Sequence, residues 1–91
     1  MFFGNTSLNI SLQLAERHKI LRKKGGFTQS EIAERSGVSL GSIKRFERTG
    51  KISLESLLKL SEVLGRLSDY DQLFLLDVDP NIDKLFFDKT Q

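Results

Sequence analysis

The 91-residue chain contains no cysteine and no tryptophan, and its only proline is Pro80. Without cysteine it has no disulfide framework, no zinc–thiolate site and no cysteine nucleophile, and it suits a reducing compartment. No stretch approaches the roughly 18 consecutive apolar residues of a membrane-spanning helix. The opening MFFGNTSLNIS has neither the basic region nor the apolar length of a signal peptide. We therefore expect a soluble cytoplasmic protein.

Groups for catalysis are scarce as well. His18 is the only histidine, and we interpret it as a core residue rather than a ligand. No carboxylate pair, metal cluster or nucleophile–base set can be assembled from the sequence. The Gly25–Gly26 pair lacks the following lysine and the spacing of a phosphate-binding loop. We expect no enzymatic activity, no metal and no cofactor.

The charge is distributed unevenly along what its length predicts to be one small domain. Residues 1–51 carry ten basic and four acidic side chains, a net charge of +6, whereas residues 52–91 carry four basic and eight acidic, a net charge of −4. Such a chain can present one face to a polyanion while the other face is repelled by it. The alternative explanation is an asymmetric solvated surface without a partner.

The pattern of helix start and stop signals predicts an all-α fold, because no alternation of apolar and polar residues is sustained long enough for a strand. Five helical segments are expected: about residues 11–24, ended by Gly25; the segment from Thr28 to Gly37; the segment from Ser39 to about Thr49; residues 54–64, opened by Ser53; and residues 70–76, opened by Asp69. Capping boxes are expected where Thr28 precedes Glu31 and where Asp69 precedes Gln72. The stretch KLFF, residues 84–87, fits either a strand or a helical turn.

The two central segments have the features of a helix-turn-helix, in which a short turn containing glycine joins two helices. Gly37 is expected to adopt a backbone conformation that a side chain would penalise, and Ala33 is small because the helices cross there. Four apolar side chains are expected to point inward: Ile32, Val38, Ile43 and Phe46. Three basic side chains then remain on the outward face of the second helix: Lys44, Arg45 and Arg48.

Residues 27–65, FTQSEIAERSGVSLGSIKRFERTGKISLESLLKLSEVLG, resemble the helix-turn-helix domain of phage repressors, Cro proteins and their bacterial relatives. The similarity extends back through LAERHKILRKKGG and so covers residues 14–65. The positions that carry it are Thr28, Gln29, Ala33, Gly37, Val38, Ile43, Arg45, Phe46 and Glu47. The resemblance implies a five-helix, phage-repressor-like DNA-binding domain over residues 1–68, with its helix-turn-helix at 28–49 and a short C-terminal extension. Residues 69–91 would form a C-terminal helix and tail for dimerisation or partner binding.

The resemblance also implies roles for individual residues. Helix 39–49 would enter the major groove, where Arg45 would bind a guanine through two hydrogen bonds. Base reading is further assigned to Ser39, Leu40, Gly41 and Lys44, with a phosphate contact as the alternative for Lys44. Leu40 and Gly41 depart from the polar residues usual in the family; they would contact a thymine methyl group and allow close backbone approach. Phosphate contacts are assigned to Thr28, Gln29, Ser42, Arg48 and Lys51, with plain solvent exposure as the alternative for Arg48 and Lys51. Arg22 is expected to pair with Glu47.

More apolar side chains follow Gly65 than a five-helix core needs: Tyr70, Leu73, Phe74, Leu76, Val78, Ile82, Leu85, Phe86 and Phe87, to which Phe2 and Phe3 add. An exposed patch of this kind marks an interface, and one recognition helix reads few base pairs, so a homodimer is expected; a disordered tail is the alternative.

The sequence predicts a repressor that binds a palindromic DNA operator. Residues 60–74, LSEVLGRLSDYDQLF, more weakly resemble antitoxins of HipA-type kinase toxins, which would add a toxin partner. A helical protein-interaction domain without DNA binding is the third hypothesis.

Overall fold

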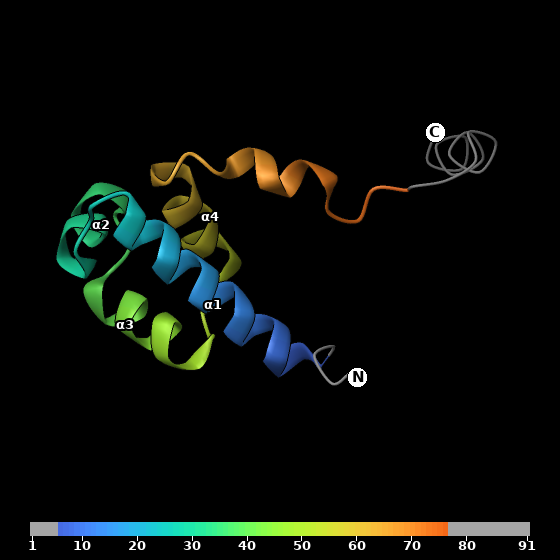
Figure 1. Ribbon diagram of the computed structural model, residues 1–91, viewed down its shortest axis with the longest axis horizontal. Helices are drawn as coiled ribbons and strands as arrows, with labels where there is room; N and C mark the ends of the chain where they lie inside the picture. Colours follow the sequence, from blue (N-terminus) through green and yellow to red (C-terminus); the bar gives the residue numbers. More distant parts are fainter. Residues whose placement is uncertain (1–5, 77–91) are drawn as a thin grey trace.

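The computed structural model describes residues 6–76, leaving residues 1–5 and 77–91 undescribed. Four α-helices and one 3₁₀ helix make up this range: α1 (Ser7–Lys24), α2 (Gln29–Ser36), α3 (Leu40–Thr49), α4 (Leu54–Val63) and η2 (Leu67–Gln72) (Figure 1). No strand occurs within residues 6–76, so the predicted all-α class is confirmed. Among the helices of these residues, none has the length and apolar character needed to cross a membrane.

Side-chain caps determine where the α-helices begin. Thr28 Oγ1 accepts a hydrogen bond from the Glu31 N–H at 3.0 Å, and the Glu31 carboxylate accepts one from the Thr28 N–H at 2.7 Å. These hydrogen bonds, the backbone one first, lower the pKa of Glu31. Ser39 and Ser53 cap α3 and α4, as predicted. Helix α1 begins at Ser7 rather than at about residue 11, because Thr6 supplies a cap that the sequence analysis overlooked.

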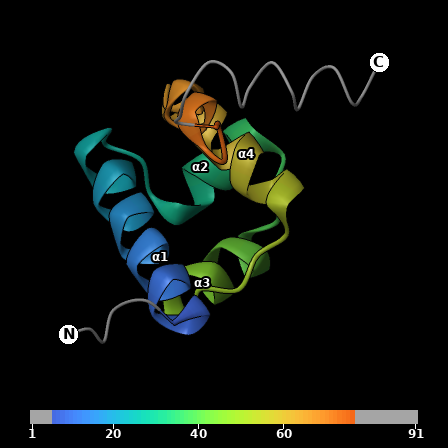
Figure 2. The ribbon, with the colours of Figure 1, turned by 90° about the vertical axis from the view of Figure 1, so that its right-hand side faces the viewer.

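The core lies where the four α-helices meet, with α1 packed against α3, and α2 packed against α3 and α4 (Figure 2). Six apolar residues form it: Ala15, Ile32, Val38, Ile43, Phe46 and Leu60. The four residues predicted to point inward are therefore all buried, and the half-buried Ala33 packs at the edge of the core. Where α3 ends, a Cβ added to Gly50 would lie 2.9 Å from the Ser11 carbonyl carbon. Glycine at this position therefore allows the end of α3 to approach α1 closely.

The prediction of an α-helix over residues 70–76, capped by Asp69 and Gln72, is wrong. A 3₁₀ helix runs from Leu67 to Gln72 without a side-chain cap, and residues 73–76 are not helical. The physical reason is competition for the carboxylate of Asp69. That carboxylate accepts a hydrogen bond from Arg66 Nε at 2.9 Å and forms an ion pair with Arg66 Nη2 at 2.8 Å, so it does not cap a helix.

The apolar residues expected in the C-terminal third divide into two groups. Tyr70 is half-buried, whereas Leu73, Phe74 and Leu76 are exposed, as is the neighbouring Leu75, which agrees with an apolar patch beyond the core. The rest lie outside the described residues: Phe2, Phe3, Val78, Ile82, Leu85, Phe86 and Phe87, together with the whole KLFF stretch.

Candidate nucleic-acid interface

The turn between α2 and α3 fixes the direction of α3. Gly37 ends α2 with a φ of 77°, in the left-handed region that the sequence analysis expected, and its N–H donates to the Ala33 carbonyl at 2.9 Å. Val38 follows with a buried side chain, and its N–H donates to Ser36 Oγ at 3.1 Å. Ser39 then caps α3. These local hydrogen bonds and the buried Val38 side chain hold the turn, so the second helix leaves it in one direction.

Replacing Gly37 by valine should lower the free energy of unfolding by at least about 1–2 kcal/mol, the cost of a left-handed conformation for a residue with a side chain. Because no atom lies within 4 Å of an added Cβ, the effect comes from the backbone conformation rather than from a clash. Thermal unfolding measures the loss. Gly41→Ala is the matched control, since that site is equally open but lies inside α3 and alanine favours helix. An unchanged midpoint for Gly37→Val would contradict the assignment.

Helix α3 has one buried and one exposed face. Ile43 and Phe46 are buried, whereas Lys44, Arg45 and Arg48 are exposed. At the N-terminal end, Ser39 and Gly41 are exposed and Leu40 and Ser42 are half-buried. Ser39 Oγ accepts from the Ser42 N–H at 3.1 Å and also donates to Ser42 Oγ at 2.8 Å. The predicted base-reading residues thus lie on the exposed face of α3 or at its start, where Leu40 is half-buried.

A buried ion pair holds α1 against α3. Arg22 Nε and Nη2 donate to the Glu47 carboxylate at 2.7 and 3.0 Å, and Arg22 Nη1 donates to the Phe27 carbonyl at 2.9 Å. Both charged side chains are only 9% exposed, and this is the pairing that the resemblance implied. Burial opposes ionisation of Glu47, but the hydrogen bonds from Arg22 and Gln29 and the charges of Arg22 and Lys19 outweigh it and lower its pKa.

Gln29, which the sequence predicts to contact a phosphate, joins the hydrogen-bond network of Arg22 and Glu47. Its Nε2 donates to Glu47 Oε1 at 3.0 Å. A side-chain amide carries two N–H groups, so the second remains for another acceptor. Glu47 therefore orients Gln29 at the first residue of α2, where free backbone N–H groups also favour an anion.

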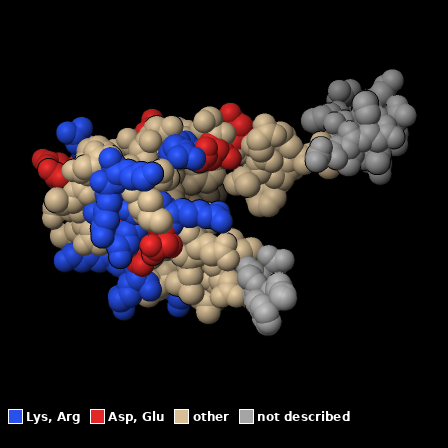
Figure 3. Space-filling view, viewed as in Figure 1, with Lys and Arg blue, Asp and Glu red and all other residues tan. Residues whose placement is uncertain are grey.

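A shallow groove of about 370 Å³ lies beside this network. It is lined by Lys19, Arg22, Lys23, Gln29, Lys44, Glu47 and Arg48. Lysines of α1 therefore join basic residues of α3 at one surface. Lys19 was not among the predicted contact residues, although its spacing of four residues from Lys23 places both on one face of a helix. In Figure 3 the Lys and Arg side chains gather over the left part of the molecule, where the C-terminal end of α1 and α2 lie.

Other predicted contact residues lie outside the groove. Arg45 is exposed on α3 but does not line the groove, and it lies one helical turn from Gly41. Lys51 follows the helix, with its N–H bonded to Thr49 Oγ1, and the Thr28 hydroxyl is engaged in the cap of α2. The arrangement is thus an exposed helix flanked on one side by a basic groove. Its dimensions and charge suit the major groove and the phosphates of duplex DNA.

In a comparison with known families, a family model described as helix-turn-helix fits residues 19–70 of the 91-residue chain. The match includes α2, the turn at Gly37, α3 and α4, and it ends at Tyr70 within η2. Neither the curated proteins nor the solved structures contain a match to this chain.

Proposed function

The chain belongs to the phage repressor and Cro-like helix-turn-helix family of DNA-binding transcriptional regulators, and we propose that it is a repressor that binds a palindromic operator as a homodimer. The observation that carries this proposal is the exposed face of α3 beside the basic groove. The Arg22–Glu47 ion pair holds the two sides of that surface, α1 and α3, in fixed register.

In the proposed complex α3 lies in the major groove with its N-terminal residues over the base edges. Arg45 binds a guanine, and Ser39, Leu40 and Gly41 approach neighbouring bases. Phosphates on one strand contact the free N–H of Gln29 and the N-terminus of α2. Besides Arg22, which pairs with Glu47, four groove cations lie against the same backbone: Lys19, Lys23, Lys44 and Arg48.

The assignment of Arg45 to base reading is tested by comparing it with its neighbour Lys44. Arg45→Ala should weaken binding to the preferred operator by about 1–3 kcal/mol and relax specificity at one base position of each half-site. Lys44→Ala should weaken binding to all sequences by a similar factor, because a phosphate contact carries no sequence information. Binding-site selection on random duplexes measures both. A motif that is unchanged by Arg45→Ala would contradict the assignment.

Dimerisation is supported by the apolar segment beyond the core. Leu73, Phe74, Leu75 and Leu76 are between 42% and 97% exposed, and exposed apolar surface of this kind marks an interface. Two copies would place their recognition helices about 34 Å apart, one turn of DNA, and so read a palindrome. The same surface also supports the second candidate function, an antitoxin in which these residues contact a HipA-like kinase toxin.

A further inference from the structure

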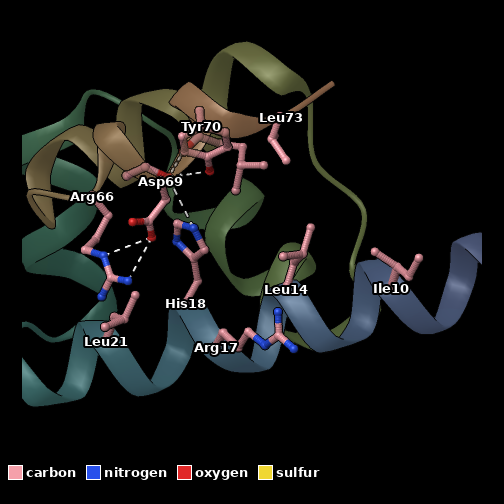
Figure 4. Close-up of a pocket in the computed structure, with 11 residues that line it drawn as sticks. Ile10, Leu14, Arg17, His18, Leu21, Arg66, Asp69, Tyr70 and Leu73 are labelled. Carbon is pink, nitrogen blue, oxygen red and sulfur yellow. Dashed lines mark hydrogen bonds and ion pairs between the residues drawn. The ribbon is translucent and has the colours of Figure 1, made fainter. Parts of the chain in front are cut away.

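A cleft of about 410 Å³ lies between α1, α4 and η2 (Figure 4). Its walls are mainly apolar: Ile10, Leu14 and Leu21 on α1, Leu57 on α4 and Leu73 after η2. Figure 3 shows the cleft as a notch between η2 and the N-terminal half of α1, on the side away from the gathered Lys and Arg side chains. It is therefore separate from the candidate nucleic-acid interface.

The polar groups in the floor of the cleft are already paired with one another. Ser61 is fully buried, and its hydroxyl donates to the Leu57 carbonyl at 2.8 Å. Tyr70 Oη at 2.7 Å and His18 Nε2 at 3.2 Å lie within hydrogen-bonding distance of the same oxygen. Burial, followed by the charge of Arg66, lowers the pKa of His18, against the opposing effects of Glu47 and Asp69. Among the described residues no buried side-chain polar atom lacks a partner, so the cleft suits an apolar occupant.

A matching apolar side chain stands next to the cleft on the same chain. Phe74 is 97% exposed and follows directly after Leu73, which lines the cleft. Its φ is 60°, the only positive value at a non-glycine residue of the described chain. This conformation costs about 1–2 kcal/mol for a residue with a side chain, and such outliers persist where they serve a function. Here it accompanies a phenyl ring that faces solvent instead of the cleft beside it.

The charges around the cleft allow a second copy to approach. Arg17, Arg66 and Asp69 line the cleft, and a second carboxylate, Asp71, lies on η2 with Asp69. The opposite side carries the basic groove, where two copies would repel each other. A symmetric contact requires one surface to carry both complementary parts. The cleft and Phe74 meet that requirement.

We propose that Phe74 of one copy inserts into the cleft of a second copy, whose own Phe74 inserts in return. The proposal rests on the homodimer of the preceding subsection and names its interface. A buried phenylalanine removes about 150–250 Å² from water, and the symmetric pair of insertions doubles that area. The adjoining Leu75 and Leu76, both exposed, continue the apolar contact.

The test measures the dimer dissociation constant of the full-length chain by sedimentation, with three variants. Phe74→Ala removes the inserted ring, and Leu14→Trp fills the cleft. Each should raise the dissociation constant on the order of 100-fold or more, since both symmetric contacts are lost at once. Leu12→Ala is the control: Leu12 is on α1 and 40% exposed but does not line the cleft, and this variant should dimerise as the parent does. Circular dichroism checks that each variant is folded.

An equimolar mixture of Phe74→Ala and Leu14→Trp provides a sharper test. The first variant keeps an open cleft and the second keeps its phenyl ring, so a mixed dimer retains one of the two insertions. The mixture should therefore associate more tightly than either variant alone. A parent dimer that Phe74→Ala leaves unchanged, or a mixture no tighter than its components, overturns the insertion but not the homodimer. A full-length chain that stays monomeric at high concentration overturns both and favours a different protein as the partner.

Discussion

Replacing Arg22 by methionine will lower the free energy of unfolding by about 3–5 kcal/mol, the usual cost of removing one partner from a buried ion pair. Glu47 would keep its burial but lose both hydrogen bonds from Arg22, and the Phe27 carbonyl would lose its donor. Denaturant unfolding measures the loss. Lys59→Met is the matched control: Lys59 contacts Glu55 at 3.3 Å, but both side chains are largely exposed. It should cost less than about 1 kcal/mol.

The pH dependence of this loss separates the ion pair from simple packing. Because the folded-state pKa of Glu47 is lowered from 4.5, its contribution to stability is complete above that value and is lost as the pH falls through the folded-state pKa. In Arg22→Met the contribution is already missing. The difference in the free energy of unfolding between the parent and Arg22→Met should therefore become smaller below about pH 4.5. If this difference in unfolding free energy is small at pH 7, or stays constant down to acid pH, the Arg22–Glu47 ion pair does not hold α1 and α3 together.

Binding to a short operator duplex will weaken by roughly 10³–10⁵ between about 50 and 200 mM salt if the dimer makes about six to ten phosphate contacts. The cations that would displace counterions lie in the groove: Lys19, Lys23, Lys44 and Arg48. The slope of log affinity against log salt, measured by fluorescence anisotropy, gives the number of contacts. An affinity that does not respond to salt would contradict the proposed binding surface.

Single variants locate the contacts within that total. Lys19→Ala should reduce the magnitude of the slope by about one for each half-site, because one phosphate contact is lost there. Lys59→Ala should leave it unchanged, because Lys59 is on α4 and does not line the groove. A slope that is unchanged by Lys19→Ala would remove Lys19 from the interface and leave the other groove cations to account for the binding.

Local signals in the sequence predicted much of the helix-turn-helix correctly. The capping box of Thr28 and Glu31 and the cap at Ser39 act within three residues, and Gly37 needs only its own backbone conformation. Whether these caps and this turn form therefore depends on residues that are close neighbours in the sequence. The same reasoning was wrong for Asp69, because Arg66 competes for its carboxylate at an equally short separation. It also overlooked the cap at Thr6, and so placed the start of α1 too late.

By itself, the sequence determined helices α2, α3 and α4, the turn and the outward direction of the α3 cations, since these depend on interactions within one helical turn and on a simple apolar periodicity. Only the tertiary structure decided which distant residues meet. Arg22 and Glu47 are 25 positions apart, Lys19 on α1 and Arg48 on α3 line one groove, and the cleft that Phe74 is proposed to fill is formed where α1, α4 and η2 come together. These contacts depend on the angles at which helices pack, and those angles result from the shape of the whole core rather than from any one segment.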